Sequence, residues 1–262
     1  MTTALVTGAD SGIGREFARQ LAHKGHAIVL VARDRERLDS VAADLRRDFE
    51  VETEVVVADL SDRAQVDRVA ARLADAVRPV DVLVNDAGFA INQGFLDSDL
   101  QLQCDMLDVL CTAVLVLSHA GGRAMRSRGR GTIINVSSVS AYEARNSYSA
   151  AKAWVRVFSL GLARELSGTG VRCTAVCPGF THTELHAREG RDMSWLPKQA
   201  WLEPEQVVTA ALSDAAKGKV VCVPTAQGKV VAAVMGVVPR GLVGNLSRRR
   251  RARAMKPATH AA

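Results

Sequence analysis

The sequence is poor in aromatic side chains, which make up 4% of its 262 residues. Proteins that bind single-stranded nucleic acid stack bases on aromatic side chains, so this composition gives no indication of such a surface. The five cysteines lack a CxxC pair or any metal-ligand spacing. Their odd number and wide spacing predict buried, reduced thiols. They are Cys104, Cys111, Cys173, Cys177 and Cys222.

Acidic residues are missing from the last part of the chain, because none follows Asp214 whereas ten of the 34 Lys and Arg residues do. The net charge of +6 is therefore unevenly distributed. Residues 1–214, the body of the protein, contain 24 basic and 28 acidic residues and have a net charge of −4. Such a body has no broad basic face for a nucleic-acid duplex. We expect no nucleic-acid partner.

Two further signatures are absent. No charged segment followed by an apolar one precedes the first glycine motif at Gly8, so we expect a cytoplasmic protein rather than an exported one. His119, His182 and His186 have no HxxxH or Cys/His companions at ligand spacing. We therefore expect no metal site.

What the sequence does contain is a series of short apolar, β-branched runs that alternate with amphipathic segments. The runs are nearly continuous, which is typical of strands covered on both faces, and helix-length connections predict right-handed crossovers. The sequence therefore predicts one α/β domain, a doubly wound, Rossmann-type fold with about seven parallel strands and helices on both faces. The expected strands are residues 4–7, 27–31, 54–57, 80–84, 132–136, 171–176 and 220–223.

The longest expected helices are residues 100–126 and 147–166. Residues 180–204 interrupt the alternation, and a connection of about 25 residues is longer than usual for a compact domain. Two interpretations stay open for this insertion: a lid or binding loop, and an ordinary surface excursion.

A glycine-rich turn follows the first strand and precedes a helix, with the sequence TGADSGIG at residues 7–14. Its glycines permit a tight turn and close backbone approach, so that a pyrophosphate can lie against the positive N-terminus of the helix. We expect this turn to bind a dinucleotide through Gly8, Ser11, Gly12, Ile13 and Gly14.

Tyr148 and Lys152 are four residues apart, which places a phenol and an ammonium on one face of a helix. Free tyrosine titrates near 10, so an adjacent cation is needed for proton exchange near neutral pH. Ser138 follows the fifth strand. Because the carboxyl ends of parallel strands open on one edge of the sheet, we expect these groups to meet the glycine turn there.

With these motifs the sequence resembles the short-chain dehydrogenase/reductases over residues 3–224: TGxxxGIG, NxAG at residues 85–88, paired serines and YxxxK follow in order. The resemblance implies that Tyr148 is the general acid or base, that Lys152 holds the nicotinamide ribose and lowers the tyrosine pKa, and that Ser138 polarises the substrate carbonyl. It also implies cofactor contacts from Asn85, Ala87, Gly88, Pro178, Gly179 and Thr183, with Thr181 as an alternative to Thr183.

The sequence departs from that family at two points. Leu110 stands where the family has an asparagine, and leucine cannot hold the water of the family's proton relay, so the supply of protons to Lys152 must be rearranged, slower or provided by another group. Ser138 and Tyr148 are also only ten positions apart. This short spacing leaves Ser137 and Ser140 open for the serine role.

The end of the second strand indicates the cofactor. Ala32 stands where NAD-preferring members have an acid, and Arg33 follows with a guanidinium that can meet a 2′-phosphate with two hydrogen bonds. Asp34 competes as a ribose-binding acid, but its charged neighbours predict a solvated helix start. NADP(H) is therefore favoured over NAD(H). Asp59 and Leu60 resemble the pair that flanks the adenine, although Asp59 is also a candidate helix N-cap.

The tail combines an apolar stretch, residues 228–238, with arginines at 248–251 and 253. The stretch is too short to span a bilayer, for which about 20 residues are needed. Two interpretations stay open: packing on the body or a partner subunit, and peripheral contact with an anionic inner membrane surface. We divide the chain into a catalytic domain, 1–226, and an apolar, then basic, C-terminal extension, 227–262.

The sequence thus predicts an NADP(H)-dependent oxidoreductase that interconverts a small-molecule carbonyl and a secondary alcohol by hydride transfer. Met193, Trp195 and Trp201 in the insertion favour an apolar substrate. A second function stays open, an NADP(H)-binding sensor or scaffold with little turnover. It is suggested by Leu110, which replaces the asparagine of the proton relay. The family resemblance implies a homodimer or homotetramer.

Overall fold

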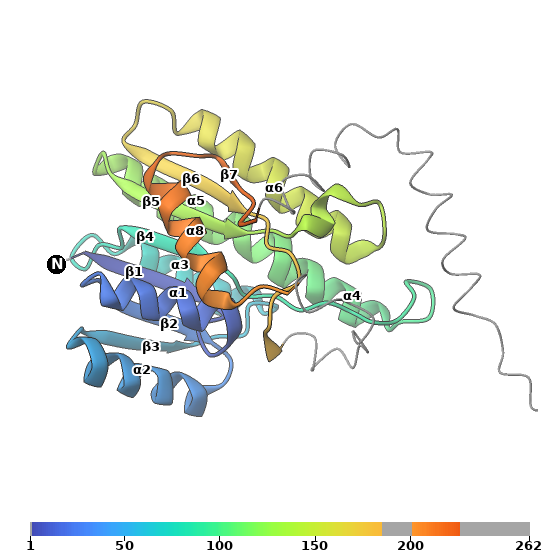
Figure 1. The fold of residues 1–262 in the computed structure, drawn as a ribbon, viewed down its shortest axis with the longest axis horizontal. Coiled ribbons are helices and arrows are strands. Elements are labelled where there is room, and N and C mark those ends of the chain that lie inside the picture. The colour runs from blue at the N-terminus through green and yellow to red at the C-terminus, as the bar shows by residue number, and fades with distance from the viewer. Residues whose placement is uncertain (1, 185–200, 226–262) are drawn as a thin grey trace, which may run out of the picture.

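The computed structural model describes residues 2–184 and 201–225. Seven parallel strands form one sheet in the order β3-β2-β1-β4-β5-β6-β7. This confirms the predicted seven-stranded doubly wound fold (Figure 1). The strands are β1 (Thr3–Thr7), β2 (Ala27–Ala32), β3 (Thr53–Val57), β4 (Val82–Asn85), β5 (Gly131–Val136), β6 (Val171–Val176) and β7 (Val221–Cys222).

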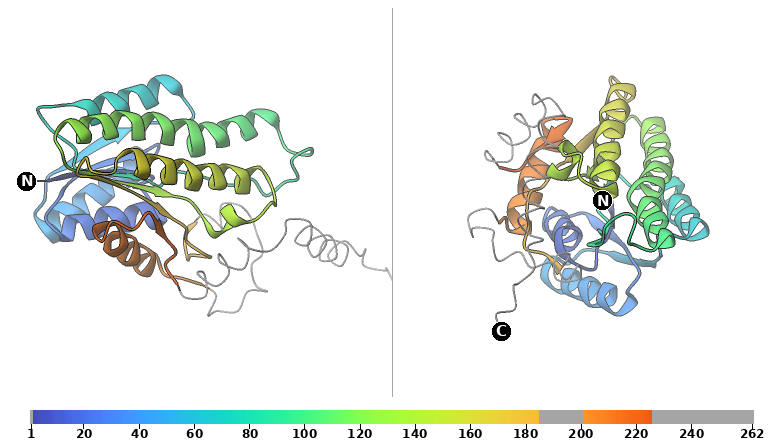
Figure 2. Two further views of the ribbon diagram at one scale, coloured as in Figure 1. Left: turned by 90° about the horizontal axis from the view of Figure 1, so that it is seen from above. Right: turned by 90° about the vertical axis from the view of Figure 1, so that its right-hand side faces the viewer.

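Helices cover both faces of the sheet, as the two views of Figure 2 show. One face carries α1 (Gly12–His23), α2 (Arg35–Phe49) and α8 (Pro204–Ala216). The other carries α3 (Arg63–Ala74), α4 (Leu100–Leu107), α5 (Ala113–Ser127) and α6 (Ser147–Glu165). A short 3₁₀ turn, Val139–Tyr142, joins β5 to the segment before α6.

The continuous apolar runs are explained by burial on two sides. In β1, Ala4 and Val6 pack into the core beneath α1, α2 and α8, whereas Leu5 packs into the core beneath α3 and α5. All three side chains are fully buried. Because side chains alternate across a strand, burial of both faces requires apolar residues at successive positions.

The direction in which successive strands are added to the sheet reverses between β1 and β4, because β2 and β3 lie on one side of β1 and β4 to β7 lie on the other. Thr7 pairs with Val31 on β2 and with Asn85 on β4, and Asn85 pairs with Asn135 on β5. The carboxyl ends of these strands therefore meet at one edge. A crevice at such a switch point is where open α/β sheets bind ligands.

A buried amide network ties β4 and β5 to the helices below that edge. Asn85 Nδ2 donates to Asn135 Oδ1 at 2.9 Å and to Ser118 Oγ at 3.2 Å, and Asn135 Nδ2 donates to Ser159 Oγ at 3.0 Å. Most polar atoms of this network are paired, although Asn85 Oδ1 is buried without a hydrogen-bond partner among the described residues. The network holds the strand ends in register beneath the cavity.

The expected helix 100–126 is interrupted. Residues Asp108–Thr112 form a π-helical turn between α4 and α5, and such turns are frequent at functional sites. The segment Leu100–Ser127 is long and apolar enough to cross a membrane by composition. However, α5 packs its Leu117 and Met125 into the core against the sheet, as a core helix of an α/β domain does.

The two ends of the insertion meet in the structure, since Thr181 pairs with Leu202 in an isolated parallel bridge. Most of the insertion, including Met193 and Trp195, lies outside the described residues, and so does the extension 227–262. The interpretations of both segments stay predictions.

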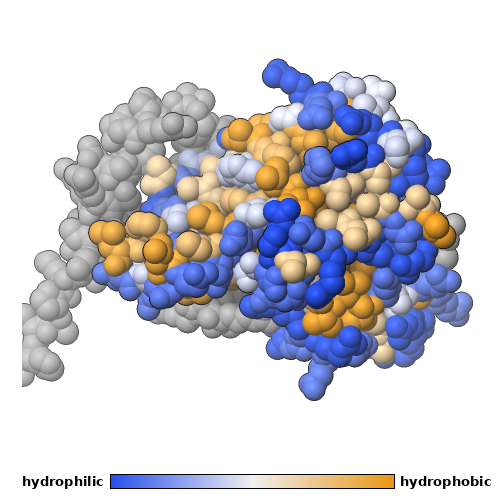
Figure 3. Space-filling view, turned by 180° about the vertical axis from the view of Figure 1, so that it is seen from behind, coloured by the Kyte–Doolittle hydropathy of each residue, from blue (hydrophilic) through white to orange (hydrophobic). Residues whose placement is uncertain are grey.

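An apolar surface lies on the face shown in Figure 3, over helices α4 to α6. Among its members are Leu107 (43% exposed), Leu115 (45%), Trp154 (37%) and Val157 (57%). Contact with a second copy would bury such a surface. The expected homodimer or homotetramer stays a prediction, which sedimentation equilibrium measures directly.

Candidate active site

A cavity of about 1400 Å³ opens at the carboxyl edge of the sheet, across the β1–β4 crevice. It collects segments that are far apart in the sequence: the glycine turn after β1, the ends of β2, β3, β4, β5 and β6, and the first turns of α6. Of the predicted residues, the lining holds Gly8, Ser11, Gly12, Ile13, Arg33, Asp59, Leu60, Ala87, Gly88, Ser138, Tyr148, Lys152, Pro178, Gly179 and Thr183.

Of the seventeen predicted site residues, the cavity lining holds fifteen. The other two, Gly14 and Asn85, lie beneath the lining. Asn85 is buried in the amide network, where its side chain supports the strand ends. Gly14 is buried in the first turn of α1.

The glycine turn requires glycine at particular positions. Gly8 and Gly12 have φ angles of 69° and 52°, in the left-handed region that other residues rarely adopt. Gly14 packs so closely that a Cβ there would collide with the Gly8 carbonyl group and would lie 2.9 Å from an Asp86 carboxylate oxygen. Helix α1 begins at Gly12 with its first N–H groups directed toward the cavity edge, an arrangement suited to an anion.

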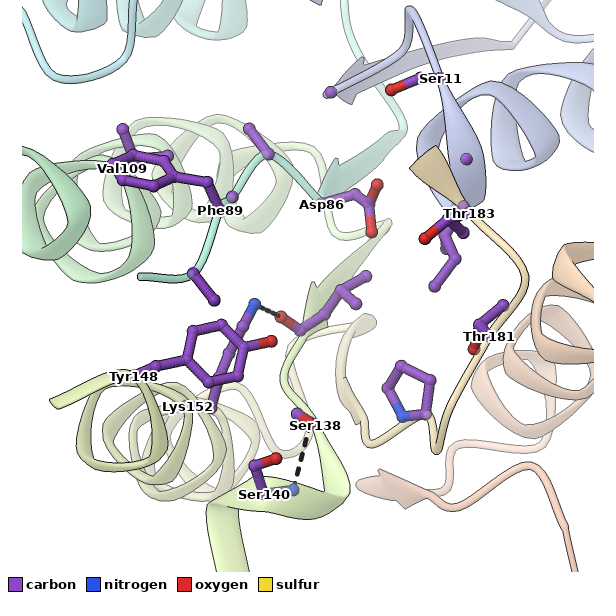
Figure 4. A pocket seen from close by; sticks show the side chains of 18 of the residues that line it. Ser11, Asp86, Phe89, Val109, Ser138, Ser140, Tyr148, Lys152, Thr181 and Thr183 are labelled. Carbon is purple, nitrogen blue, oxygen red and sulfur yellow. Dashed lines mark hydrogen bonds between the residues drawn. The ribbon is translucent and has the colours of Figure 1, made fainter. Parts of the chain in front are cut away.

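Tyr148 and Lys152 lie on the first turns of α6, which begins after Asn146 accepts a capping hydrogen bond from the Ser149 N–H. Lys152 is 5% exposed, its Nζ donates to the Val136 carbonyl oxygen at 2.7 Å, and Nζ lies 5.8 Å from the centre of the Tyr148 ring (Figure 4). Burial lowers the pKa of Lys152 to about 8, and the Asp86 carboxylate opposes that shift.

The three candidate serines have different surroundings. The Ser137 hydroxyl donates to the Lys152 carbonyl oxygen at 2.7 Å and is buried against α6. Ser138 Oγ accepts from the Ser140 N–H at 3.1 Å (Figure 4). All three serines line the cavity, but only the Ser137 hydroxyl is held by a helix carbonyl. The geometry therefore favours Ser138 or Ser140 over Ser137 for contact with a substrate.

Asp86 is a cavity residue that the sequence analysis did not select. The residue is partly buried, lines the cavity, and accepts a hydrogen bond from the Gly14 N–H with its carboxylate. Burial raises the pKa of Asp86 to about 7, although the Lys152 ammonium opposes this shift. The available signal was an acid inside the NxAG motif, directly after a buried strand.

The end of β2 brings cations to the cavity. Arg33 is exposed, with its guanidinium 3.9 Å from the Asp59 carboxylate. Asp34 is the N-cap of α2 and accepts from the Arg37 N–H at 3.1 Å, which confirms its prediction as a helix start. Arg37 also lines the cavity and pairs with Glu184 at 2.6 Å; sequence analysis missed it because it lies one turn into the helix.

Asp59 is not the helix N-cap that the sequence left open. Asp62 caps α3, whereas Asp59 accepts from the Ser61 N–H and hydroxyl in a tight turn at the end of β3. Asp59 and Leu60 both line the cavity. The N-cap interpretation was wrong because the turn continues for three residues before the helix starts.

The segment after β6 contributes the opposite wall. Thr183 lies beside Gly12, close enough that a Cβ on Gly12 would meet it at 3.1 Å. The Thr181 hydroxyl donates instead to the Gly179 carbonyl oxygen at 3.1 Å. Both threonines line the cavity.

Comparison with known proteins identifies the family. The sequence profile described as short chain dehydrogenase matches residues 2–194. The chain belongs to the short-chain dehydrogenase family. A galactitol 2-dehydrogenase (L-tagatose-forming) of Cereibacter sphaeroides is 37% identical over 221 residues, which cover 80% of this chain and 85% of that protein.

Solved structures of short-chain dehydrogenases have the same fold. One from Sphingobium yanoikuyae, in complex with NADPH, is 33% identical with a TM-score of 0.82 and covers 100% of this chain and 98% of its own. The bulky-bulky ketone specific alcohol dehydrogenase of Comamonas testosteroni is 29% identical with a TM-score of 0.78, at 100% and 97% coverage. This short-chain dehydrogenase is therefore an oxidoreductase with a Rossmann-like fold.

Leu110 is the departure of this short-chain dehydrogenase that the structure locates most clearly. It is 1% exposed, lies in the π-helical turn, and packs with Met106, Ile91 and Ala151. Its side chain also approaches Gly88, where a Cβ would collide with it. An apolar cluster thus fills the space beside Lys152 on this side.

Proposed function

We propose that this protein is an NADP(H)-dependent oxidoreductase that interconverts a carbonyl and a secondary alcohol, with Tyr148 as the general acid or base. The observation that carries the proposal is the Tyr148–Lys152 pair, with Nζ anchored to the Val136 carbonyl oxygen, in the same cavity as the glycine turn. A binding site needs no positioned proton donor, whereas carbonyl reduction does.

The glycine turn fits a dinucleotide, because Gly8 and Gly12 adopt backbone angles that bring N–H groups to the cavity and leave room for a pyrophosphate. NADP(H), when bound, supplies or accepts the hydride. Gly8, Ser11, Gly12 and Ile13 hold the phosphates, while Ala87, Gly88, Pro178, Gly179 and Thr183 line the remaining path. Gly14 and Asn85 act from beneath, by packing and by fixing the strand ends.

The proton is handled by the chain's own residues. In the reducing direction the Tyr148 hydroxyl donates its proton to the carbonyl oxygen, and the Lys152 ammonium stabilises the negative charge left on the phenol oxygen. Ser138 Oγ accepts from the Ser140 N–H, so its own hydrogen is available to the substrate oxygen. In the oxidising direction the same groups act in reverse.

The preference for NADP(H) rests on Arg33, and the Sphingobium yanoikuyae relative in complex with NADPH supports it. We expect Arg33→Ala to raise the Kd for NADPH about tenfold, because an exposed guanidinium contributes modestly to binding a 2′-phosphate, and to leave the Kd for NADH nearly unchanged. Fluorescence titration with both cofactors measures this. Arg35→Ala is the matched control, since Arg35 pairs with Asp39 on α2; an equal loss for both cofactors in Arg33→Ala would contradict the assignment.

An apolar substrate is supported by apolar side chains that line the cavity, which include Phe89, Ile91, Val109 and Phe180. The relative that is specific for bulky-bulky ketones is consistent with such a substrate, whereas the galactitol dehydrogenase acts on a polar one. NADPH consumption, followed by absorbance against short-chain, long-chain, cyclic and polyol-derived carbonyls, tests the whole proposal.

The sensor or scaffold function is the second candidate, and buried Leu110 is the observation that favours it. The same assay separates the two functions. Turnover with any carbonyl supports the enzyme; tight NADPH binding without turnover across the panel supports the sensor.

We propose a cytoplasmic protein whose extension, residues 227–262, follows the catalytic domain, residues 1–226, and makes peripheral contact with an anionic membrane surface. The basis is the charge pattern, an apolar stretch before five closely spaced arginines. Deletion of residues 240–262 should abolish co-sedimentation of the protein with anionic vesicles. Neutral vesicles are the control. Unchanged co-sedimentation would contradict the membrane contact and favour packing of the tail on protein.

A further inference from the structure

Asp86 places an acid at the centre of the proposed cofactor site. It follows β4 directly, at the crevice between β1 and β4, and Figure 4 shows its side chain between Ser11 on the glycine turn and Lys152 on α6. Its carboxylate accepts the Gly14 N–H, one of the groups at the N-terminus of α1. An anion of the protein therefore already lies where the fold is suited to an anionic ligand.

The charged groups around Asp86 come from two elements. Asp10 on the glycine turn disfavours its ionised form, and Lys152 on α6 favours it. Lys152 in turn interacts with Cys111 on the π-helical turn and Cys177 after β6. Burial raises the pKa of Cys111 to about 11 and also raises that of Cys177, so neither thiol supplies a negative charge near neutral pH. Asp86 is thus the acid of this group that changes charge near pH 7.

A dinucleotide would change this balance. Its diphosphate brings negative charge to the glycine turn, and two like charges that share a poorly solvated site cannot both stay ionised without a large cost. Lys152 is held against the Val136 carbonyl oxygen and cannot move freely to neutralise the added charge. After protonation, the Asp86 carboxyl group still has an oxygen that can accept the Gly14 N–H. Proton uptake therefore requires no rearrangement of the glycine turn.

We propose that Asp86 makes cofactor binding proton-linked: its carboxylate takes up a proton from solvent when the anionic dinucleotide enters the cavity. This inference rests on the proposed NADP(H) function. By linkage, the affinity for the cofactor falls as the pH rises, since above neutral pH the free protein must first bind the proton. A carboxylate that titrates near pH 7 in the free protein and is protonated in the complex gives about a tenfold rise in Kd between pH 6 and pH 8.

The test compares NADPH binding by the full chain with that by Asp86→Asn, which keeps the size of the side chain and removes its titration. We expect the ratio of the wild-type Kd to the Asp86→Asn Kd to rise about tenfold from pH 6 to pH 8. The ratio cancels the titration of the cofactor's own phosphate. Asp10→Asn is the matched control, an acid on the same cavity wall: it should retain the pH dependence, moved to lower pH because the Asp10 charge raises the pKa of Asp86.

A carboxyl-specific signal distinguishes Asp86 from Lys152. Infrared difference spectra at pH 7 should show growth of a protonated-carboxyl band when NADPH binds to the wild-type protein and to Asp10→Asn, and no such band in Asp86→Asn. The inference would be overturned if NADPH bound with a Kd ratio that does not change with pH and without growth of the protonated-carboxyl band. It would also be overturned if the band were lost in Asp10→Asn but not in Asp86→Asn. Failure of the wild-type protein to bind NADPH would instead overturn the proposed function on which the inference rests.

Discussion

Tyr148→Phe should lower kcat for carbonyl reduction by about 100-fold or more and leave the Kd for NADPH nearly unchanged. The substitution removes the proton donor, and general acid catalysis contributes roughly 10²–10⁴-fold. The phenyl ring keeps its place over Lys152, so the fold of α6 and the Nζ contact with Val136 are retained. Stopped-flow or steady-state absorbance of NADPH gives kcat, and fluorescence titration gives Kd.

Tyr142 provides the matched control because it is the other tyrosine of the chain. Its ring lies under the Arg156 guanidinium, 4.7 Å from it, and its hydroxyl interacts with Cys177. Tyr142→Phe should therefore keep most of the turnover. Equal losses in the two variants, or normal turnover in Tyr148→Phe, would show that Tyr148 is not the proton donor.

Gly14→Ala is expected to have the second largest effect, loss of measurable NADPH binding in the micromolar range. The added Cβ collides with the Gly8 carbonyl group, which is backbone and cannot yield cheaply, and it also meets the Asp86 carboxylate. The turn must open to relieve the clash, which displaces the N–H groups that would hold the phosphates. Overpacking of this kind also costs about 1–3 kcal/mol of stability.

Gly161→Ala is the control for Gly14→Ala. Gly161 lies in α6, and a Cβ added there would meet no atom within 4 Å. The Gly161→Ala variant should therefore bind NADPH normally, and alanine should stabilise the helix by up to about 1 kcal/mol. Thermal unfolding separates a local effect from a global one. If Gly14→Ala folds and binds NADPH as tightly as the wild-type protein, the turn does not hold the phosphates.

The sequence predicted the strands and the order of the motifs because both depend on local patterns. A run such as AIVLVA in β2 is apolar at successive positions because both faces of the sheet are covered, so the pattern alone indicates a buried parallel strand. The predicted strand ends differ from the observed ones: β4 ends at Asn85 rather than at residue 84, and β7 is limited to Val221–Cys222. Ladder hydrogen bonds with neighbouring strands decide those ends.

The candidate site divides in the same way. The spacing of Tyr148 and Lys152 is a property of one helix, and the glycines at 8, 12 and 14 are a property of one turn, so each was visible in the sequence. Asp86 and Arg37 were missed because their importance arises from neighbours on other elements: the Gly14 N–H and Lys152 for Asp86, and Glu184 for Arg37. The π-helical turn at Asp108–Thr112 likewise had no local signal.

By itself, the sequence determined the fold class, the family and the chemical groups available, because hydrophobic periodicity, turn chemistry and helical spacing act over a few residues. The tertiary structure decided that the Ser137 hydroxyl is bonded to α6, that Asp62 rather than Asp59 caps α3, and that an acid lies between the glycine turn and Lys152. The last of these outcomes depends on contacts between residues that are far apart in the sequence, such as Gly14, Asp86 and Lys152. Charge and burial at a site are set by everything packed around it, and only the folded chain brings those groups together.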